Sequence, residues 1–277
     1  MTTGSIPRFF VFAVWVGILL PGGKAEAQMS RTFTKTVDIE TTGTVTLNVV
    51  KGSARVTTWD RPAVEVRAQV DGKNAAQIKK AQLQVEEASR EVTIRMQETG
   101  GGEGGLLALL GLGESDGPDT HYRIRMPVTA DLSLTTESAS VEVRGVAGDV
   151  TIEGSSSPIH LRNVTGDATV ATFSGSLDAD SLRGDLIFAT FSGDATVRRQ
   201  ALDGDHQLAT FSGNADITLP ADAAFDLQTD ITWGGSVTSD FAAPDSSAQG
   251  EGPLPIGGGG PTLAFESFSG SLTLRAE

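Results

Sequence analysis

The chain has 277 residues, carries a net charge of −14 and contains no cysteine. Its 39% hydrophobic content excludes a chain that is disordered throughout. The lack of cysteine excludes disulfides and a lipidated N-terminal cysteine, and the negative charge disfavours binding to nucleic acid or anionic lipid. The 33 glycines predict many turns between short elements.

Residues 1–27 have the pattern of a secretory signal peptide. Arg8 precedes an apolar run, Phe9–Leu20, and the small-x-small sequence Ala25-Glu26-Ala27 follows it. The run is too short to span a bilayer, which needs about 20 residues. We therefore predict cleavage after residue 27 and export from the cytoplasm, with an uncleaved signal anchor as the alternative.

Residues 28–100 are predicted to form a β-rich but less regular N-terminal region, because Val45, Leu47 and Val49 alternate with polar residues. Residues 101–117 are a Gly/Leu-rich insertion, which we expect to form a loop because its glycine flanks give no rigid attachment and so short an apolar run cannot form a stable helix alone. Exposed apolar residues there would be candidates for docking a partner or a membrane surface. These candidates are Leu106, Leu107, Leu109 and Leu110.

Residues 118–277 are organised by an internal repeat with a step of 18 to 20 residues. The pentapeptide Ala-Thr-Phe-Ser-Gly occurs at Ala171–Gly175, Ala189–Gly193 and Ala209–Gly213. Gly-Asp pairs alternate with it and keep the same step. They are Gly148-Asp149, Gly166-Asp167, Gly184-Asp185 and Gly204-Asp205. Apolar residues follow each marker at the second and fourth positions, which predicts two short strands in every repeat.

A repeat of this length cannot bury its own apolar face. Stacking the repeats as coils about 4.8 Å apart buries one continuous core and pairs the backbone along the stack. The sequence therefore predicts an all-β fold, a single-chain parallel β-solenoid (β-helix) of short 18–20-residue coils. Residues 28–277 would form one continuous domain. A sandwich of antiparallel hairpins is the alternative, but equivalent residues recur at constant spacing rather than in mirrored order.

Several segments occur in the order found in a known family. Gly52–Val56 is followed by Trp59-Asp60, then by Tyr122–Pro127, the repeated Ser-Gly units and the closing stretch Gly260–Leu274. Together they resemble the putative adhesin family, a bacterial envelope domain of unknown function. The resemblance implies a solenoid fold and an envelope location, and it offers no catalytic residues to carry over.

Motifs for catalysis and metal binding are not found. His121, His160 and His206 lack the spacing of a metal site, and His206 lies at an inward position that favours a core imidazole over a ligand. The sequence has no Gly-x-Ser-x-Gly elbow and no Walker loop. The aspartates of the Gly-Asp pairs would stack along one edge, either to bind calcium or, as we favour, to stabilise tight turns. We predict no catalytic, cofactor or metal residues.

A row of phenylalanines forms the candidate partner-binding surface. Val170 is inward by its offset, so strict alternation places Thr172 inward and Phe173 outward. The full row is Phe173, Phe191, Phe211 and Phe268. An apolar stripe of a few hundred Å² often marks an interaction surface. The alternative is a bend before each Ser-Gly that returns the rings to the core. Trp233 is left out, because the alternation slips before it.

The predicted function is that of a non-enzymatic, exported envelope protein in the periplasm, on the cell surface or secreted. It would be an adhesin-like binding or structural module that presents its solenoid surface to a protein or polysaccharide partner. An accessory component of envelope-stress signalling is the alternative, and a carbohydrate-active enzyme is a more distant one. We expect no cofactor, no nucleic-acid partner and no integral membrane segment after signal cleavage.

Overall fold

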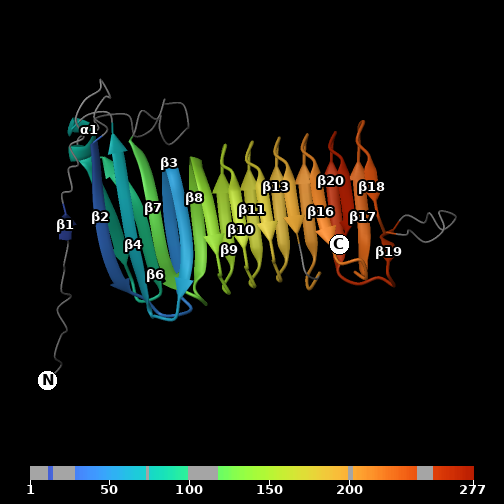
Figure 1. The fold of residues 1–277 in the computed structure, drawn as a ribbon, viewed down its shortest axis with the longest axis horizontal. Coiled ribbons are helices and arrows are strands. Elements are labelled where there is room, and N and C mark those ends of the chain that lie inside the picture. The colour runs from blue at the N-terminus through green and yellow to red at the C-terminus, as the bar shows by residue number, and fades with distance from the viewer. Residues whose placement is uncertain (1–11, 15–28, 73–74, 99–117, 199–201, 242–251) are drawn as a thin grey trace.

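The computed structural model describes residues 12–14, 29–72, 75–98, 118–198, 202–241 and 252–277 (Figure 1). The predicted docking leucines of the 101–117 insertion lie outside these residues, and so does the predicted signal peptide apart from β1 (Phe12–Val14). The described part is almost entirely β, with one short helix, α1 (Ala75–Lys80). All its strands belong to one connected sheet that surrounds a single hydrophobic core. No helix in these residues is long and apolar enough to cross a membrane.

The N-terminal part mixes antiparallel and parallel pairing. Its remaining strands are β2 (Met29–Asp38), β3 (Thr44–Trp59), β4 (Ala63–Gly72), β5 (Ala81–Glu87), β6 (Glu91–Glu98), β7 (Asp119–Pro127) and β8 (Asp131–Arg144). Strand β4 pairs antiparallel with β2 and β7, and β5 with β6. Strand β3 pairs parallel with β6, β7 and β8. This is the irregular β region that the sequence predicts before the repeats.

The long strands β3 and β8 turn a corner and so begin two rows of strands. Residues 44–49 of β3 pair with 131–136 of β8, and residues 51–56 pair with 138–143. At the corner the inward positions change from odd to even residues in β3, where Val49 and Ala54 are both buried. Every later coil contributes one short strand to each row.

The two rows form the parallel β-solenoid. The first row is β9 (Val150–Gly154), β11 (Ala168–Thr172), β13 (Leu186–Thr190), β15 (His206–Thr210), β20 (Thr262–Ser267) and β17 (Phe225–Ile231). The second is β10 (Ile159–Arg162), β12 (Leu177–Asp180), β14 (Ala195–Arg198), β16 (Ala215–Leu219), β21 (Leu272–Ala276) and β18 (Val237–Ser239). Ala168 pairs with Leu186 and Leu186 with His206, in parallel. The predicted coils and their step are therefore confirmed.

The last two coils do not follow chain order. Strands β20 and β21 pair with β15 and β16 on one side and with β17 and β18 on the other. The C-terminal coil therefore lies inside the stack (Figure 1), and β17, β18 and the short β19 (Leu254–Ile256) end it. The inserted coil carries Phe268-Ser269-Gly270, the same turn as Phe211–Gly213, on which it stacks.

The glycine of each Ser-Gly pair is required by close packing of one coil on the next. A Cβ at Gly193 would lie 1.9 Å from the carbonyl oxygen of Gly175, and a Cβ at Gly213 would lie 1.9 Å from that of Gly193. None of these glycines has a positive φ; Gly52 and Gly145 are among the few that do. Close approach of the two backbones, and not a positive φ, therefore explains the glycines at the Ser-Gly markers.

The aspartates of the Gly-Asp pairs link neighbouring coils. The Asp149 Oδ1 accepts the backbone N–H of Asp167 at 3.1 Å, and the Asp167 Oδ1 accepts that of Asp185 at 2.9 Å. The same bond joins the coils before and after them. We expected each aspartate to bond within its own turn, but it bonds to the next coil. Among the described residues no cluster of three or more His, Cys, Asp or Glu side chains is placed to hold a metal ion.

Candidate binding groove

The four predicted phenylalanines lie side by side on the outside of the solenoid. Each follows a first-row strand and begins a Ser-Gly turn. Their exposed fractions, in chain order, are 62%, 46%, 45% and 41%. Neighbouring ring centroids lie 5.1, 4.8 and 4.8 Å apart, and the planes are within 4° of parallel. We call Phe173, Phe191, Phe211 and Phe268 the phenylalanine ridge.

Trp233 extends the ridge onto the terminal coil. Its ring centroid lies 6.5 Å from that of Phe268 with 20° between the planes, and the residue is 70% exposed. Leaving Trp233 out is therefore wrong. Strand β17 keeps its alternation only as far as Leu227, after which three consecutive residues are exposed. The backbone N–H of Trp233 donates to the Phe268 carbonyl at 2.6 Å, which keeps the Trp233 side chain beside the ridge.

A row of hydroxyls lies beneath the ridge and bonds to the turns or to the next coil. The Thr210 Oγ1 accepts the N–H of Gly213 at 2.8 Å, and the Ser267 Oγ accepts that of Gly270 at 2.6 Å. The Thr172 hydroxyl bonds to the Thr190 hydroxyl of the next coil at 3.0 Å. Backbone bonds from the serine of each turn to the phenylalanine of the turn before it place the turns on top of one another, and the phenyl rings stack.

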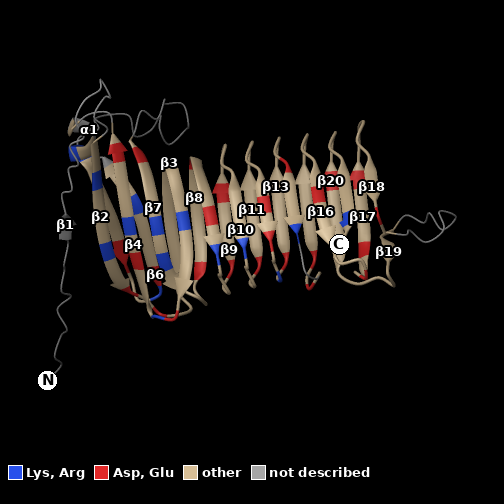
Figure 2. Ribbon diagram, in the orientation of Figure 1, with Lys and Arg blue, Asp and Glu red and all other residues tan. Residues whose placement is uncertain are grey.

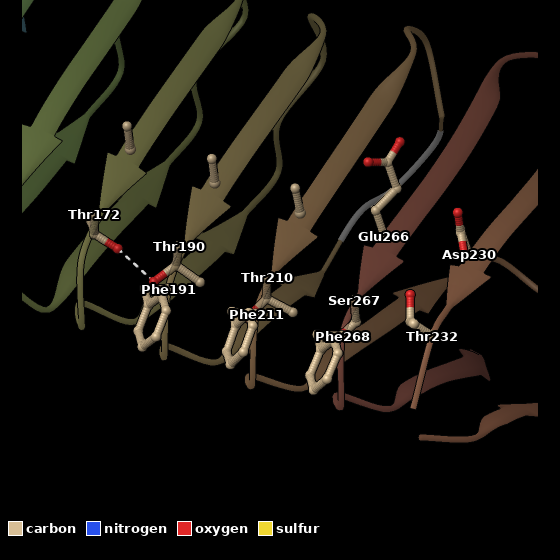
Figure 3. Close-up of a pocket in the computed structure, with 13 residues that line it drawn as sticks. Thr172, Thr190, Phe191, Thr210, Phe211, Asp230, Thr232, Glu266, Ser267 and Phe268 are labelled. Carbon is tan, nitrogen blue, oxygen red and sulfur yellow. Dashed lines mark hydrogen bonds between the residues drawn. The ribbon is translucent and has the colours of Figure 1, made fainter. Parts of the chain in front are cut away.

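A groove of about 570 Å³ runs beside the ridge (Figure 3). Three alanines in register, Ala171, Ala189 and Ala209, form its floor. Because alanine is the shortest outward side chain of these strands, the surface is hollow there. At one end the row continues with Glu266 and then Asp230, which both line the groove. At the other end it continues with Glu153. An apolar groove with acidic ends is the result.

A second, polar cleft of about 390 Å³ lies on the outside of β3, β4 and β7. In it the Ser53 Oγ lies 2.9 Å from the His121 Nδ1, and the His121 Nε2 lies 3.4 Å from the Asp71 Oδ2. The sequence does not reveal this cluster, because the three residues come from three separate strands. A Ser–His–Asp arrangement is the activating part of an acyl-transfer site.

The cleft lacks the other part of such a site. Acyl transfer also needs N–H donors aimed at the oxygen of the tetrahedral intermediate. The N–H groups of β3 and β7 point into the ladders on both sides of each strand. The cluster therefore has a hydrogen-bonded serine without an oxyanion hole in the described sheet.

An ion-pair network borders the polar cleft. Burial alone would raise the pKa of Glu142, but hydrogen bonds and charge from Arg144 and Arg55 outweigh it and lower that pKa. The Arg55 Nε lies 2.6 Å from the Glu142 Oε2. The network links β3 to β8 on the surface of the sheet.

The other two histidines have structural partners. His206 is buried, and its Nδ1 accepts the N–H of Leu186 at 3.2 Å, in agreement with the predicted core imidazole. The His160 Nδ1 lies 3.5 Å from the Asp178 Oδ2 on the second row.

The family resemblance is confirmed by a match between residues 124–252 and the family model described as Toastrack DUF4097. Among curated proteins no match is found. Three solved structures are similar to this chain. A putative cell adhesion protein of Clostridium sporogenes is 11% identical with a TM-score of 0.40, covering 90% of this chain and 100% of its own. A putative adhesin of Bacteroides fragilis is 9% identical with a TM-score of 0.39, covering 88% and 96%. A putative adhesin of Parabacteroides distasonis is 13% identical with a TM-score of 0.37, covering 87% and 96%.

Proposed function

We propose that this chain, whose residues 124–252 match the Toastrack DUF4097 family model, is an exported, non-enzymatic binding module of the cell envelope. Its partner docks along the phenylalanine ridge. The single observation that supports this is the ridge itself, an unbroken stack of four exposed aromatic rings beside an alanine-floored groove. Soluble proteins rarely expose contiguous apolar surface of this kind unless it binds something.

Stability alone does not account for the ridge. Stacked rings do stabilise neighbouring coils, but the buried rows of valine, leucine and isoleucine already hold the coils together. A purely structural ladder would also be served by threonine or valine, whose smaller apolar surface carries less risk of aggregation. Exposed phenylalanine in four coils is the costly choice, and binding explains it.

The test is capture from an envelope extract by the immobilised protein and two variants. Phe191→Ser interrupts the ridge. Ile187→Ser removes an equally exposed side chain from β13, the strand just before Phe191, at a position outside the groove. We expect Phe191→Ser to lose the captured partner and Ile187→Ser to keep it. Equal capture by both variants would contradict the proposal.

Export is tested separately by N-terminal sequencing of the protein recovered from cells. A mature chain that starts at Gln28 is the expected result. Recovery of the chain with Phe9–Leu20 retained in a membrane fraction would overturn the export part of the proposal and leave the groove untouched.

A further inference from the structure

We infer that the groove binds a polypeptide segment whose apolar stretch is flanked on both sides by lysine or arginine. The inference rests on the proposed function and adds the chemistry of the partner. Three observations carry it: the charge of the face around the groove, the distance between its acidic ends and the way the phenyl rings are stacked.

The charged side chains of the face around the groove are all acidic. None of the six first-row strands β9, β11, β13, β15, β20 and β17 contains a Lys or Arg. In Figure 2 most basic residues lie at the N-terminal end, on strands that include β2, β4 and β7, and the others lie outside the first row. Glu153, Asp230 and Glu266 form no ion pair within the described residues, whereas Asp216 of the second row pairs with Arg275 at 2.8 Å. Carboxylates left without a basic partner beside an apolar groove complement a cationic partner.

The acids stand at the two ends of the alanine floor. Glu153, the three alanines and Glu266 occupy consecutive coils at the same register position, and Asp230 follows on the terminal coil. Four coil steps of about 4.8 Å separate Glu153 from Glu266 by about 19 Å. An extended chain covers that distance in about six residues. The partner therefore needs about six small or apolar residues between its basic side chains.

The stacking of the rings favours a polypeptide over a polysaccharide. Sugars dock on open ring faces, but in the ridge each inner ring is covered on both faces by its neighbours. What remains is a line of ring edges beside alanine methyl groups. Four of the five hydroxyls that line the groove already have hydrogen-bond partners. Thr172 bonds to Thr190, Thr210 accepts the Gly213 N–H and Ser267 accepts the Gly270 N–H. Apolar side chains fit such a surface better than hydroxyl-rich sugars do.

The probe is a fluorescently labelled peptide of two lysines, six alternating leucine and threonine residues and two lysines. Its binding to the purified protein is measured by anisotropy at low and at physiological salt. Asp230→Asn/Glu266→Gln should weaken binding by about fivefold and reduce its salt dependence. Phe191→Ser should weaken it by about tenfold at both salt concentrations.

Matched controls separate groove binding from attraction to a negatively charged protein. The double variant Asp222→Asn/Glu277→Gln removes the same charge at exposed positions outside the groove and should bind as the parent does. A peptide of the same composition with its four lysines in the centre should bind more weakly than the probe. A peptide with glutamate in place of lysine should not bind.

Equal effects of the two double variants, or equal binding of the two lysine peptides, would overturn the inference. Binding of a neutral polysaccharide that depends on Phe191 would overturn it too. If Phe191 still governs capture from the envelope extract in those cases, the proposed function stands and only the partner's chemistry is wrong. If Phe191 governs neither readout, both fail.

Discussion

The replacement Phe191→Ser tests whether the ridge rings are stacked and exposed. Phe191 has a stacked neighbour on each side, at 5.1 and 4.8 Å. An aromatic pair contributes about 0.5–1.5 kcal/mol beyond burial, so two pairs give about 1–3 kcal/mol. Phe173, at the end of the ridge, has one such neighbour among the described residues. Phe173→Ser should therefore cost less than Phe191→Ser by about one pair, or 0.5–1.5 kcal/mol.

Free energies of unfolding from urea titrations of the two variants and of the double variant give the coupling directly. Phe188 supplies the reference for a core ring. It is buried, and it lies on β13, the strand that ends just before Phe191. Removing a buried phenylalanine costs about 3–5 kcal/mol. Equal losses for Phe191→Ser and Phe188→Ser would refute the exposed ridge. Equal losses for Phe191→Ser and Phe173→Ser would refute the stacking.

Three further replacements test the interactions between coils and the buried phenol. Gly193→Ala should lower the free energy of unfolding, measured by urea titration, by about 1–3 kcal/mol, because its Cβ would collide with the Gly175 carbonyl of the preceding coil. In the control Gly252→Ala the new Cβ meets nothing within 4 Å, and stability should not change. Asp167→Ala should lower the free energy of unfolding by about 1 kcal/mol, because the hydrogen bond from the Asp185 N–H is lost. Asp167→Asn keeps an acceptor oxygen and should retain most of that stability. No loss of stability in Asp167→Ala would show that the bond does not contribute. Burial raises the pKa of the Tyr122 phenol, so the unfolded chain releases this proton first and stability should fall as the pH rises above about 10. Tyr122→Phe should reduce that fall in melts at pH 8 to 11, and absorbance of the chain's one tyrosine should show a titration midpoint above 10.

The solenoid is predictable because one register is carried through every coil. Two markers with the same step place equivalent residues on top of one another, and period-two alternation then decides which side chains point outward. The parity of Val170 thus places Phe173 outside, and in-register pairing carries that result to Phe191 and Phe211.

Features that depend on contacts between distant segments are not predictable in this way. The position of β20 between β15 and β17 reverses the chain order of the last two coils, and the repeat pattern in the sequence does not specify that order. The Ser53–His121–Asp71 cluster needs the pairing of β3, β4 and β7, which carry no repeat. Trp233 reaches the ridge through a backbone bond from a strand that has lost its alternation.

The extent of the groove is determined by how the coils differ. Inward residues, turn glycines and linking aspartates make the same contacts in each coil. They stabilise the stack, but they do not distinguish one coil from another. Outward residues are free to vary, and at one end of the groove two of them change at the same coil. The coil of β9 has Glu153 where the next coil has Ala171, and Ser155 where the next has Phe173. The alanine floor and the phenylalanine ridge therefore begin at the same coil. At the other end the floor stops at Glu266, while the row of aromatic rings continues to Trp233. Stability of the stack alone does not require both positions to change at the same coil. A binding site of defined length does.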